Sequence, residues 1–183
     1  MAPPKTIGSR EVHAAMERLA AAIEARHRRK GSLLVLGIAN GGIPVARRLC
    51  ARLGMKRVGE LDISFHRDDI GRHPIPKEFT PTLLPGDING ADVLLVDDVL
   101  FTGRTVKAAL DELFDHGRPA SVELAVLVDR GCRRLPVSAD FTGTTVSAAV
   151  DEDVVVSLSE NPARDRIEIR PRPAPARSAA AIR

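Results

Sequence analysis

Apolar and polar positions fall into blocks along the chain that predict strands and helices in turn. The continuous aliphatic run Val93–Val96 is typical of a strand buried on both faces of a parallel sheet. Leu33–Ile38 is predicted to be the first buried strand, and Ser121–Val128 a further aliphatic strand. Apolar residues at helical spacing predict helices over residues 9–29 and 43–53 and a third from about Gly103 onward. The pattern therefore predicts an α/β fold, with a parallel sheet covered by helices.

The remaining pattern predicts one folded domain over residues 1–170, with a long internal loop and a tail. Val58–Phe65 alternates roughly as a further strand. Four short β candidates lie near the C-terminus: Val137–Phe141, Thr144–Val146, Val154–Leu158 and Arg166–Ile169. Residues 66–91 show little periodicity and contain four prolines, which predicts a long flexible loop with a functional role. The Pro/Ala/Arg-rich residues 171–183 predict a disordered basic tail.

Charge and cysteine content narrow the classes of function. The formal net charge is +3, but without the three tail arginines 24 basic residues face 24 acidic ones. A neutral body, with five Phe and no Tyr or Trp, gives little support for a basic or aromatic nucleic-acid face. Cys50 and Cys132 are isolated, which predicts reduced thiols in a cytoplasmic protein. We see no signal-peptide pattern and no apolar run long enough to cross a bilayer, so no membrane partner is expected.

The most informative stretch joins the run Val93–Val96 to an amphipathic helix through two acids and a turn containing glycine. Asp97 and Asp98 come at the predicted carboxyl end of the strand, where open α/β sheets bind ligands. The amides of Thr102–Thr105 come at the predicted helix start, where free amides and the helix dipole favour a phosphate. Acids beside a phosphate site suit a sugar phosphate, because carboxylates bind ribose hydroxyls or a metal. A solvated turn is the simpler alternative.

Two other loops follow predicted strands. Ala39–Gly42 joins a strand to a helix, so its amides could approach an anion, although two glycines could equally serve only the turn. Asp129–Arg134 follows the strand Ser121–Val128 and is expected to face the same crevice. The basic cluster Arg26–Lys30 closes the first helix, where the helix dipole favours cations; RNA contact is the alternative interpretation.

The string from Val93 to Thr105 resembles the 5-phosphoribosyl-1-diphosphate (PRPP) motif of type I phosphoribosyltransferases: four hydrophobic residues, two acids and a Thr/Gly-rich loop. Further segments resemble the pyrimidine-operon regulators of that family: His66–Asp69, His116–Pro119, Leu124–Pro136 and Ala139–Gly143. The resemblance covers roughly Ile7 to Ile169. It implies the type I fold, a central mostly parallel sheet with a small β-rich hood.

The resemblance also implies activities and partners. These are conversion of uracil and PRPP to UMP and diphosphate with Mg²⁺, and UMP-dependent control of pyrimidine genes through binding of leader RNA. A homodimer or higher homo-oligomer is implied as well.

By position, the resemblance assigns roles to residues of this chain. Asp97 and Asp98 would hold the ribose hydroxyls, directly or through Mg²⁺, and with Arg130 they are the implied catalytic residues. Thr102–Thr105 would bind the 5-phosphate, and Ala39–Gly42 the diphosphate. The implied substrate-binding residues are Asn40, Gly41, Asp97, Asp98, Val99, Leu100, Phe101, Thr102, Gly103, Arg104, Thr105, the pair Asp129 and Arg130 beside the diphosphate or metal, and Val154 near the base.

Three features depart from the family pattern. Asn40 and Gly41 are uncharged where the family usually has an arginine, a loss of about 1.5–3 kcal/mol of charge-assisted bonding to a diphosphate. Ser147–Asp151 replaces a Pro-Thr-Ser stretch with a basic residue. On the first helix, Glu17 and Ala21 stand where RNA-binding members tend to be polar or basic, although Arg133 and Arg134 keep positive charge elsewhere.

Three hypotheses therefore stay open: a uracil phosphoribosyltransferase, a catalytically weak nucleotide-sensing regulator, and a phosphoribosyltransferase for another base. The intact acid pair favours the first. The arginine-free Asn40-Gly41 favours the second. The third stays open because the choice of base depends on contacts of the backbone and the hood.

Overall fold

The computed structural model describes residues 5–27, 33–66 and 81–172, and it contains two sheets. The larger is formed by β2 (Leu33–Ile38), β3 (Gly59–Leu61), β4 (Asp92–Leu100), β5 (Ser121–Asp129) and β6 (Phe141–Thr145). Its strands are all parallel, in the order β3-β2-β4-β5-β6. The smaller sheet is formed by β1 (Lys5–Ile7), β7 (Glu152–Ser157) and β8 (Arg166–Pro171). It is antiparallel, in the order β1-β8-β7, and we call it the hood.

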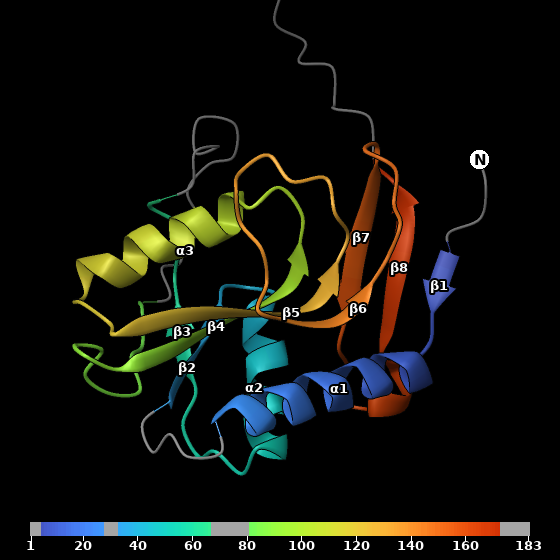
Figure 1. Cartoon of the computed structure of the whole chain (residues 1–183). Helices are drawn as coiled ribbons and strands as arrows, with labels where there is room; N and C mark the ends of the chain where they lie inside the picture. The colour runs from blue at the N-terminus through green and yellow to red at the C-terminus, as the bar shows by residue number, and fades with distance from the viewer. Residues whose placement is uncertain (1–4, 28–32, 67–80, 173–183) are drawn as a thin grey trace, which may run out of the picture.

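Helices cover both faces of the larger sheet (Figure 1). α1 (Ser9–His27) and α2 (Gly42–Arg52) lie on one face and α3 (Arg104–Asp115) lies on the other, while a short 3₁₀ helix, η1 (Pro162–Arg164), precedes β8. Leu94 and Val96 pack in the cluster beneath α1 and α2, whereas Val93 and Leu95 pack beneath α3. Successive strand residues point to opposite faces, so a strand covered on both sides must be continuously apolar. The predicted α/β architecture is confirmed.

Several predicted boundaries were wrong. β4 does not end at Val96 but continues to Leu100, so the two acids lie inside the strand. The strand expected over Val58–Phe65 is only Gly59–Leu61, and the two candidates between Val137 and Val146 are replaced by one strand, Phe141–Thr145. β1 was not predicted. Pairing with a neighbouring strand decides where a strand ends, and periodicity along one segment does not contain that information.

Part of the predicted loop at 66–91 belongs to the packed body. Residues 67–80 lie outside the described residues, as do 173–183 of the predicted tail. Leu83 exchanges backbone hydrogen bonds of 2.8 and 2.9 Å with Glu60, and Ile88 is buried beneath α3. Cys50 and Cys132 are both free thiols. Among the described residues, no helix combines the length and apolar character that crossing a membrane requires.

The strand order places two loops opposite each other. From β2 the chain passes through α2 to β3 on one side, whereas from β4 it passes through α3 to β5 on the other. The order therefore reverses between β2 and β4, and ligands of open α/β sheets bind at the carboxyl ends of strands at such a point. The loop Ala39–Gly42 and the segment from Asp97 to Gly103 meet there. β7 of the hood also contacts β4.

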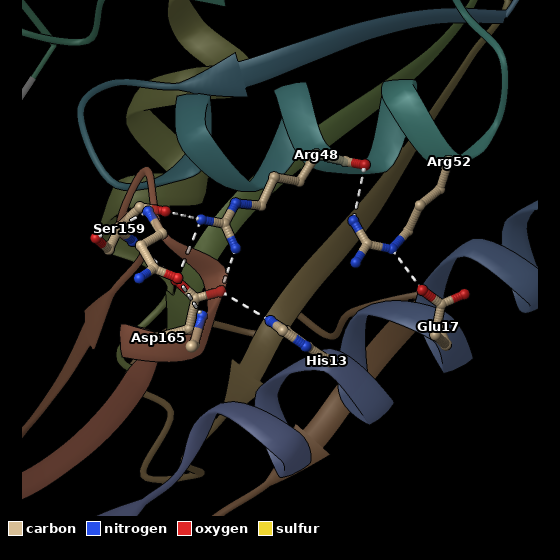
Figure 2. A network of polar contacts seen from close by, with 8 residues as sticks. His13, Glu17, Arg48, Arg52, Ser159 and Asp165 are labelled. Atoms are coloured by element: carbon tan, nitrogen blue, oxygen red, sulfur yellow. Dashed lines mark hydrogen bonds and ion pairs between the residues drawn. The ribbon is translucent and has the colours of Figure 1, made fainter.

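A buried carboxylate fixes the hood to the helices (Figure 2). The side chain of Asp165, between η1 and β8, is fully buried and accepts hydrogen bonds from Arg48 of α2, from the Ser159 amide at 2.8 Å and from His13 Nε2 of α1 at 3.1 Å. Arg48 also donates to the Ser159 carbonyl. Burial alone would raise the pKa of Asp165, but the hydrogen bonds from Arg48, the Ser159 amide and His13 outweigh it and lower the pKa. The loop between β7 and β8 is thereby tied to α1 and α2.

Replacing this carboxylate should destabilise the fold in a pH-dependent way. We expect Asp165→Asn to lower the free energy of unfolding by about 2–3 kcal/mol at pH 7, because Arg48 loses its partner. A lowered folded-state pKa contributes stability above the ordinary aspartate pKa of about 3.9, and that contribution disappears as pH falls through the folded value. Urea unfolding should therefore show a difference from wild type that is full at pH 7 and shrinks near pH 3.

Glu17→Gln provides the matched control. It breaks the exposed Arg52–Glu17 pair of 2.7 Å in the same region (Figure 2), and exposed pairs contribute little. Equal effects of the two substitutions, or a difference for Asp165→Asn that does not depend on pH, would contradict the assignment.

Candidate functional site

The acid pair, Asp97 and Asp98, lies near the end of β4 and is held by the strand's own backbone. Asp97 is 5% exposed, and its Oδ1 accepts the Asp98 amide at 2.9 Å. Asp98 is half-buried, and its Oδ1 accepts the Val99 amide at 2.8 Å. Each carboxylate is therefore oriented before any ligand arrives.

Two adjacent carboxylates, one buried and one half-buried, repel one another. Burial and the neighbouring charge of Asp98 raise the pKa of Asp97 well above its ordinary value. Burial also raises the pKa of Asp98, against the opposing effect of the hydrogen bond from the Val99 amide. A cation or hydroxyl groups beside the pair would relieve this cost.

The glycines of the loop Ala39–Gly42 allow it to lie directly against β4. A Cβ on Gly41 would stand 2.5 Å from the Asp98 carboxylate, and a Cβ on Gly42 would stand 2.1 Å from the Val96 carbonyl oxygen. The two glycines are therefore required for close approach to the acid pair and not merely for a turn. The Ala39–Asn40 peptide in this loop is cis, and the Asn40 side chain is exposed.

The segment Thr102–Thr105, which we call the phosphate loop, turns the chain from β4 into α3. Gly103 has φ 91° at the N-cap, a conformation that favours glycine, and Lys107 donates its amide to the Gly103 carbonyl at 3.0 Å. Thr102 Oγ1 accepts the Arg104 amide at 3.3 Å, and Arg104 and Thr105 are exposed in the first turn. The first amides of a helix lack partners within the helix, so this turn presents donors suited to a phosphate.

Arg133 braces the phosphate loop from the segment after β5. Its guanidinium donates to the carbonyls of Leu100 and Phe101 at 3.2 and 2.9 Å and to the Asp129 carboxylate at 2.6 Å. The amides of Arg134 and Leu135 both donate to the Thr102 carbonyl at 3.0 Å. Sequence reasoning missed this function of Arg133, because its acceptors are mainly backbone carbonyls, which leave no signature in a sequence.

Arg130 connects the site with the entry to the hood. It is 4% exposed, and its two terminal nitrogens donate to the carbonyls of Ala149 and Glu152, each at 2.7 Å. Its guanidinium carbon lies 3.9 Å from the centre of the Phe101 ring. In the part of the chain that the structure describes, its buried Nε has no hydrogen-bond partner.

The remaining residues predicted for the site differ in burial and in location. Asp129 is half-buried and caps the Gly131 amide at 2.8 Å. The Leu100 side chain is buried in the core beneath α3, so only its backbone is near the site. Val99 and Val154 are partly buried and pack against the cluster beneath α1 and α2. The other predicted residues meet at the point where the strand order reverses: Asn40, Gly41, the acid pair and the phosphate loop. Val154 belongs to the hood instead.

The donor set of the acid pair fits Mg²⁺. Carboxylate oxygens are hard ligands, and Mg²⁺ is commonly held by one or two carboxylates together with substrate phosphates. Asp97 and Asp98 leave one oxygen each beyond the two that accept backbone amides. Bound there, Mg²⁺ would neutralise negative charge on a phosphate-bearing ligand.

Solved structures with a similar fold are phosphoribosyltransferases. The structure of the hypoxanthine phosphoribosyltransferase of Trypanosoma cruzi matches with a TM-score of 0.66 at 22% identity, over 90% of this chain and 94% of that chain. A hypoxanthine-guanine phosphoribosyltransferase of Bacillus anthracis matches with a TM-score of 0.65 at 19% identity, over 93% and 99%. At these identities the likeness shows the fold alone, and it confirms the predicted type I fold.

Sequence comparison gives the family. Residues 8–157 match the model of the phosphoribosyl transferase domain. The Bifunctional protein PyrR 1 of Lactiplantibacillus plantarum is 47% identical over 164 residues, which cover 85% of this chain and 90% of that protein. The Bifunctional protein PyrR of Deinococcus radiodurans is 44% identical over 177 residues, which cover 92% and 95%. The chain therefore belongs to the phosphoribosyltransferase family and, within it, to the PyrR group.

Proposed function

We propose that this protein is a uracil phosphoribosyltransferase that also acts as a UMP-responsive regulator of pyrimidine biosynthesis genes. The observation that carries the proposal is the position of the acid pair, in a strand that lies against the loop Ala39–Gly42, which we call the glycine loop, and leads into the phosphate loop. Gly41 lies against the Asp98 carboxylate, and α3 begins four residues after the strand's end. PRPP matches these three features in one ligand, because it is a ribose with a phosphate at one end and a diphosphate at the other. Membership of the PyrR group supports uracil as the base.

The proposed reaction follows from the placement of charge. Uracil N1 bonds to C1′ of PRPP, the bond from C1′ to the diphosphate oxygen breaks, and the diphosphate leaves with the electron pair. The N1 proton passes to solvent. Asp97 and Asp98 hold the ribose hydroxyls beside a carbon that gains positive character, and the amides of the phosphate loop hold the 5-phosphate. Mg²⁺ at the acid pair would neutralise the leaving diphosphate.

We assign Arg130 a positioning role. Both terminal nitrogens of its guanidinium already hold the carbonyls of Ala149 and Glu152. Its contact with Phe101 links this entry to the hood with the end of β4. Its buried Nε–H, which has no partner among the described residues, is a donor suited to an oxygen of the diphosphate, beside which this residue is expected to lie. The residue thus supports the hood over the site in addition to contributing charge.

The regulatory half of the proposal needs an RNA surface, and several basic residues expected there have internal partners. The Arg133 guanidinium holds the carbonyls that precede the phosphate loop. Arg26 pairs with Glu123 at 2.8 Å, and Glu17 pairs with Arg52. Arg134 remains exposed. We propose that the chain forms a cytoplasmic homodimer and binds pyrimidine-operon leader RNA, on its resemblance to the pyrimidine-operon regulators.

Turnover is the direct test of the enzymatic half. We expect UMP to form from uracil, PRPP and Mg²⁺, and no nucleotide to form with guanine or xanthine as base. The double variant Asp97→Asn/Asp98→Asn should lose PRPP binding, because the amide side chains cannot hold the metal or accept both ribose hydroxyls as carboxylates do. Nucleotide formation can be followed chromatographically, and PRPP binding by calorimetry. UMP binding without turnover on any base would leave a sensor and reject the enzyme.

The loop Ala39–Gly42, proposed to bind the diphosphate, offers a gain-of-function test. We expect Asn40→Arg to tighten diphosphate binding about ten- to a hundredfold, because charge-assisted bonds contribute about 1.5–3 kcal/mol. Asn40→Gln, which adds length without charge, is the control and should change little. Gly41→Arg should abolish binding, since even its Cβ would stand 2.5 Å from the Asp98 carboxylate. Calorimetric titration with diphosphate and Mg²⁺ measures all three, and equal affinities for the arginine and glutamine variants at position 40 would contradict the assignment.

RNA binding is tested by gel shift with the pyrimidine-operon leader. We expect UMP to strengthen binding, since a regulator must couple its nucleotide site to its RNA surface. A chain truncated after Arg172 is the control for attraction by the basic residues beyond it. Binding that ignores UMP and disappears with the truncation would reject the regulatory role.

A further inference from the structure

A second group of metal-ligating side chains lies at the far end of α3 from the phosphate loop. His66 follows β3, and Glu112 and Asp115 belong to the last turn of α3. One ligand atom from each lies within 4.8 Å of the other two. At a rise of about 1.5 Å per residue, Asp115 is roughly 16 Å along the helix from Arg104, so this group is separate from the acid pair.

Both carboxylates contact the same nitrogen atom of His66. His66 Nε2 lies 3.2 Å from Glu112 Oε2 and 3.2 Å from Asp115 Oδ2. One N–H shared between two oxygens makes a bifurcated hydrogen bond, and 3.2 Å is the long end of the hydrogen-bond range. A metal ion would use the lone pairs of all three atoms together.

Glu112 is oriented independently of His66. Its Oε1 accepts the Thr82 hydroxyl at 2.6 Å and contacts His116 Nε2 at 3.0 Å. Its Oε2 is thereby directed towards His66, and the carboxylate is only 14% exposed. Asp115, at 70% exposed, is free to adjust its rotamer around an ion.

Two of the three distances between these atoms suit a tetrahedral site, and the third, between the two carboxylates, is at most 4.8 Å. Zinc bonds of about 2.0–2.1 Å to imidazole nitrogen and carboxylate oxygen place neighbouring ligand atoms about 3.3 Å apart. Both distances from His66 Nε2 are 3.2 Å. Mixed imidazole and carboxylate ligands favour Zn²⁺ over Mg²⁺, which takes oxygen ligands.

We propose that His66, Glu112 and Asp115 bind Zn²⁺, with water as the fourth ligand and His116 as a positioning residue for Glu112. Nothing in the proposed transferase reaction requires this ion. It joins the segment after β3 to the C-terminal end of α3, and its role is structural.

Calorimetric titration of the full chain with Zn²⁺ tests the site, with excess Mg²⁺ present to occupy the acid pair. We expect one equivalent of Zn²⁺ to bind and to raise the melting temperature, since an ion that binds only the folded state stabilises it. Co²⁺ in place of Zn²⁺ should give visible absorption bands characteristic of nitrogen and oxygen ligands.

Variants then locate the ion. His66→Gln and Glu112→Gln should abolish Zn²⁺ binding and the Co²⁺ bands, and His116→Gln should weaken binding about ten- to a hundredfold by releasing Glu112. Asp111→Asn is the matched control, because this acid of the same helix pairs with Lys107 and should leave binding unchanged. Absence of stoichiometric binding to wild type, or binding that survives His66→Gln, would overturn the proposal and leave ion pairs only.

Discussion

The close approach of the loop Ala39–Gly42 to β4 is the constraint on which the site depends. Gly41 touches the Asp98 carboxylate and Gly42 the Val96 carbonyl, at distances that leave no room for a Cβ. The loop that precedes α2 and the strand that leads to the phosphate loop therefore share one wall. This contact holds the loop against the acid pair, and it leaves position 40, but not positions 41 and 42, open to a larger side chain.

Positive charge near the site is used mainly to hold backbone. Arg133 donates to the carbonyls of Leu100 and Phe101, and Arg130 to those of Ala149 and Glu152. Charged donors satisfy buried carbonyls more strongly than neutral ones do. The loops around the acid pair are consequently fixed before a ligand binds. Less positive charge is therefore exposed at the surface than the number of arginines suggests.

The hood and the glycine loop are parts of one connected unit. α2 begins at Gly42 in the loop and carries Arg48, which holds the buried Asp165 below the hood. β7 of the hood contacts β4, where the acid pair lies. These two contacts connect the hood to the loop that faces the acids and to the strand that carries them.

The sequence by itself determined the central strands, the three helices, the acid pair with its phosphate loop, and the family. Those features depend on local periodicity and on one contiguous motif, Val93 to Thr105. Only the tertiary structure decided that β4 contains the acids, that Gly41 and Gly42 are needed for close contact, and that Arg133 holds a loop. The contacts that decide such points join residues of different elements. His13 and Asp165, for example, are in contact although they are 152 positions apart in the sequence. Contacts at such separation depend on how the chain folds back on itself, and no local pattern records them.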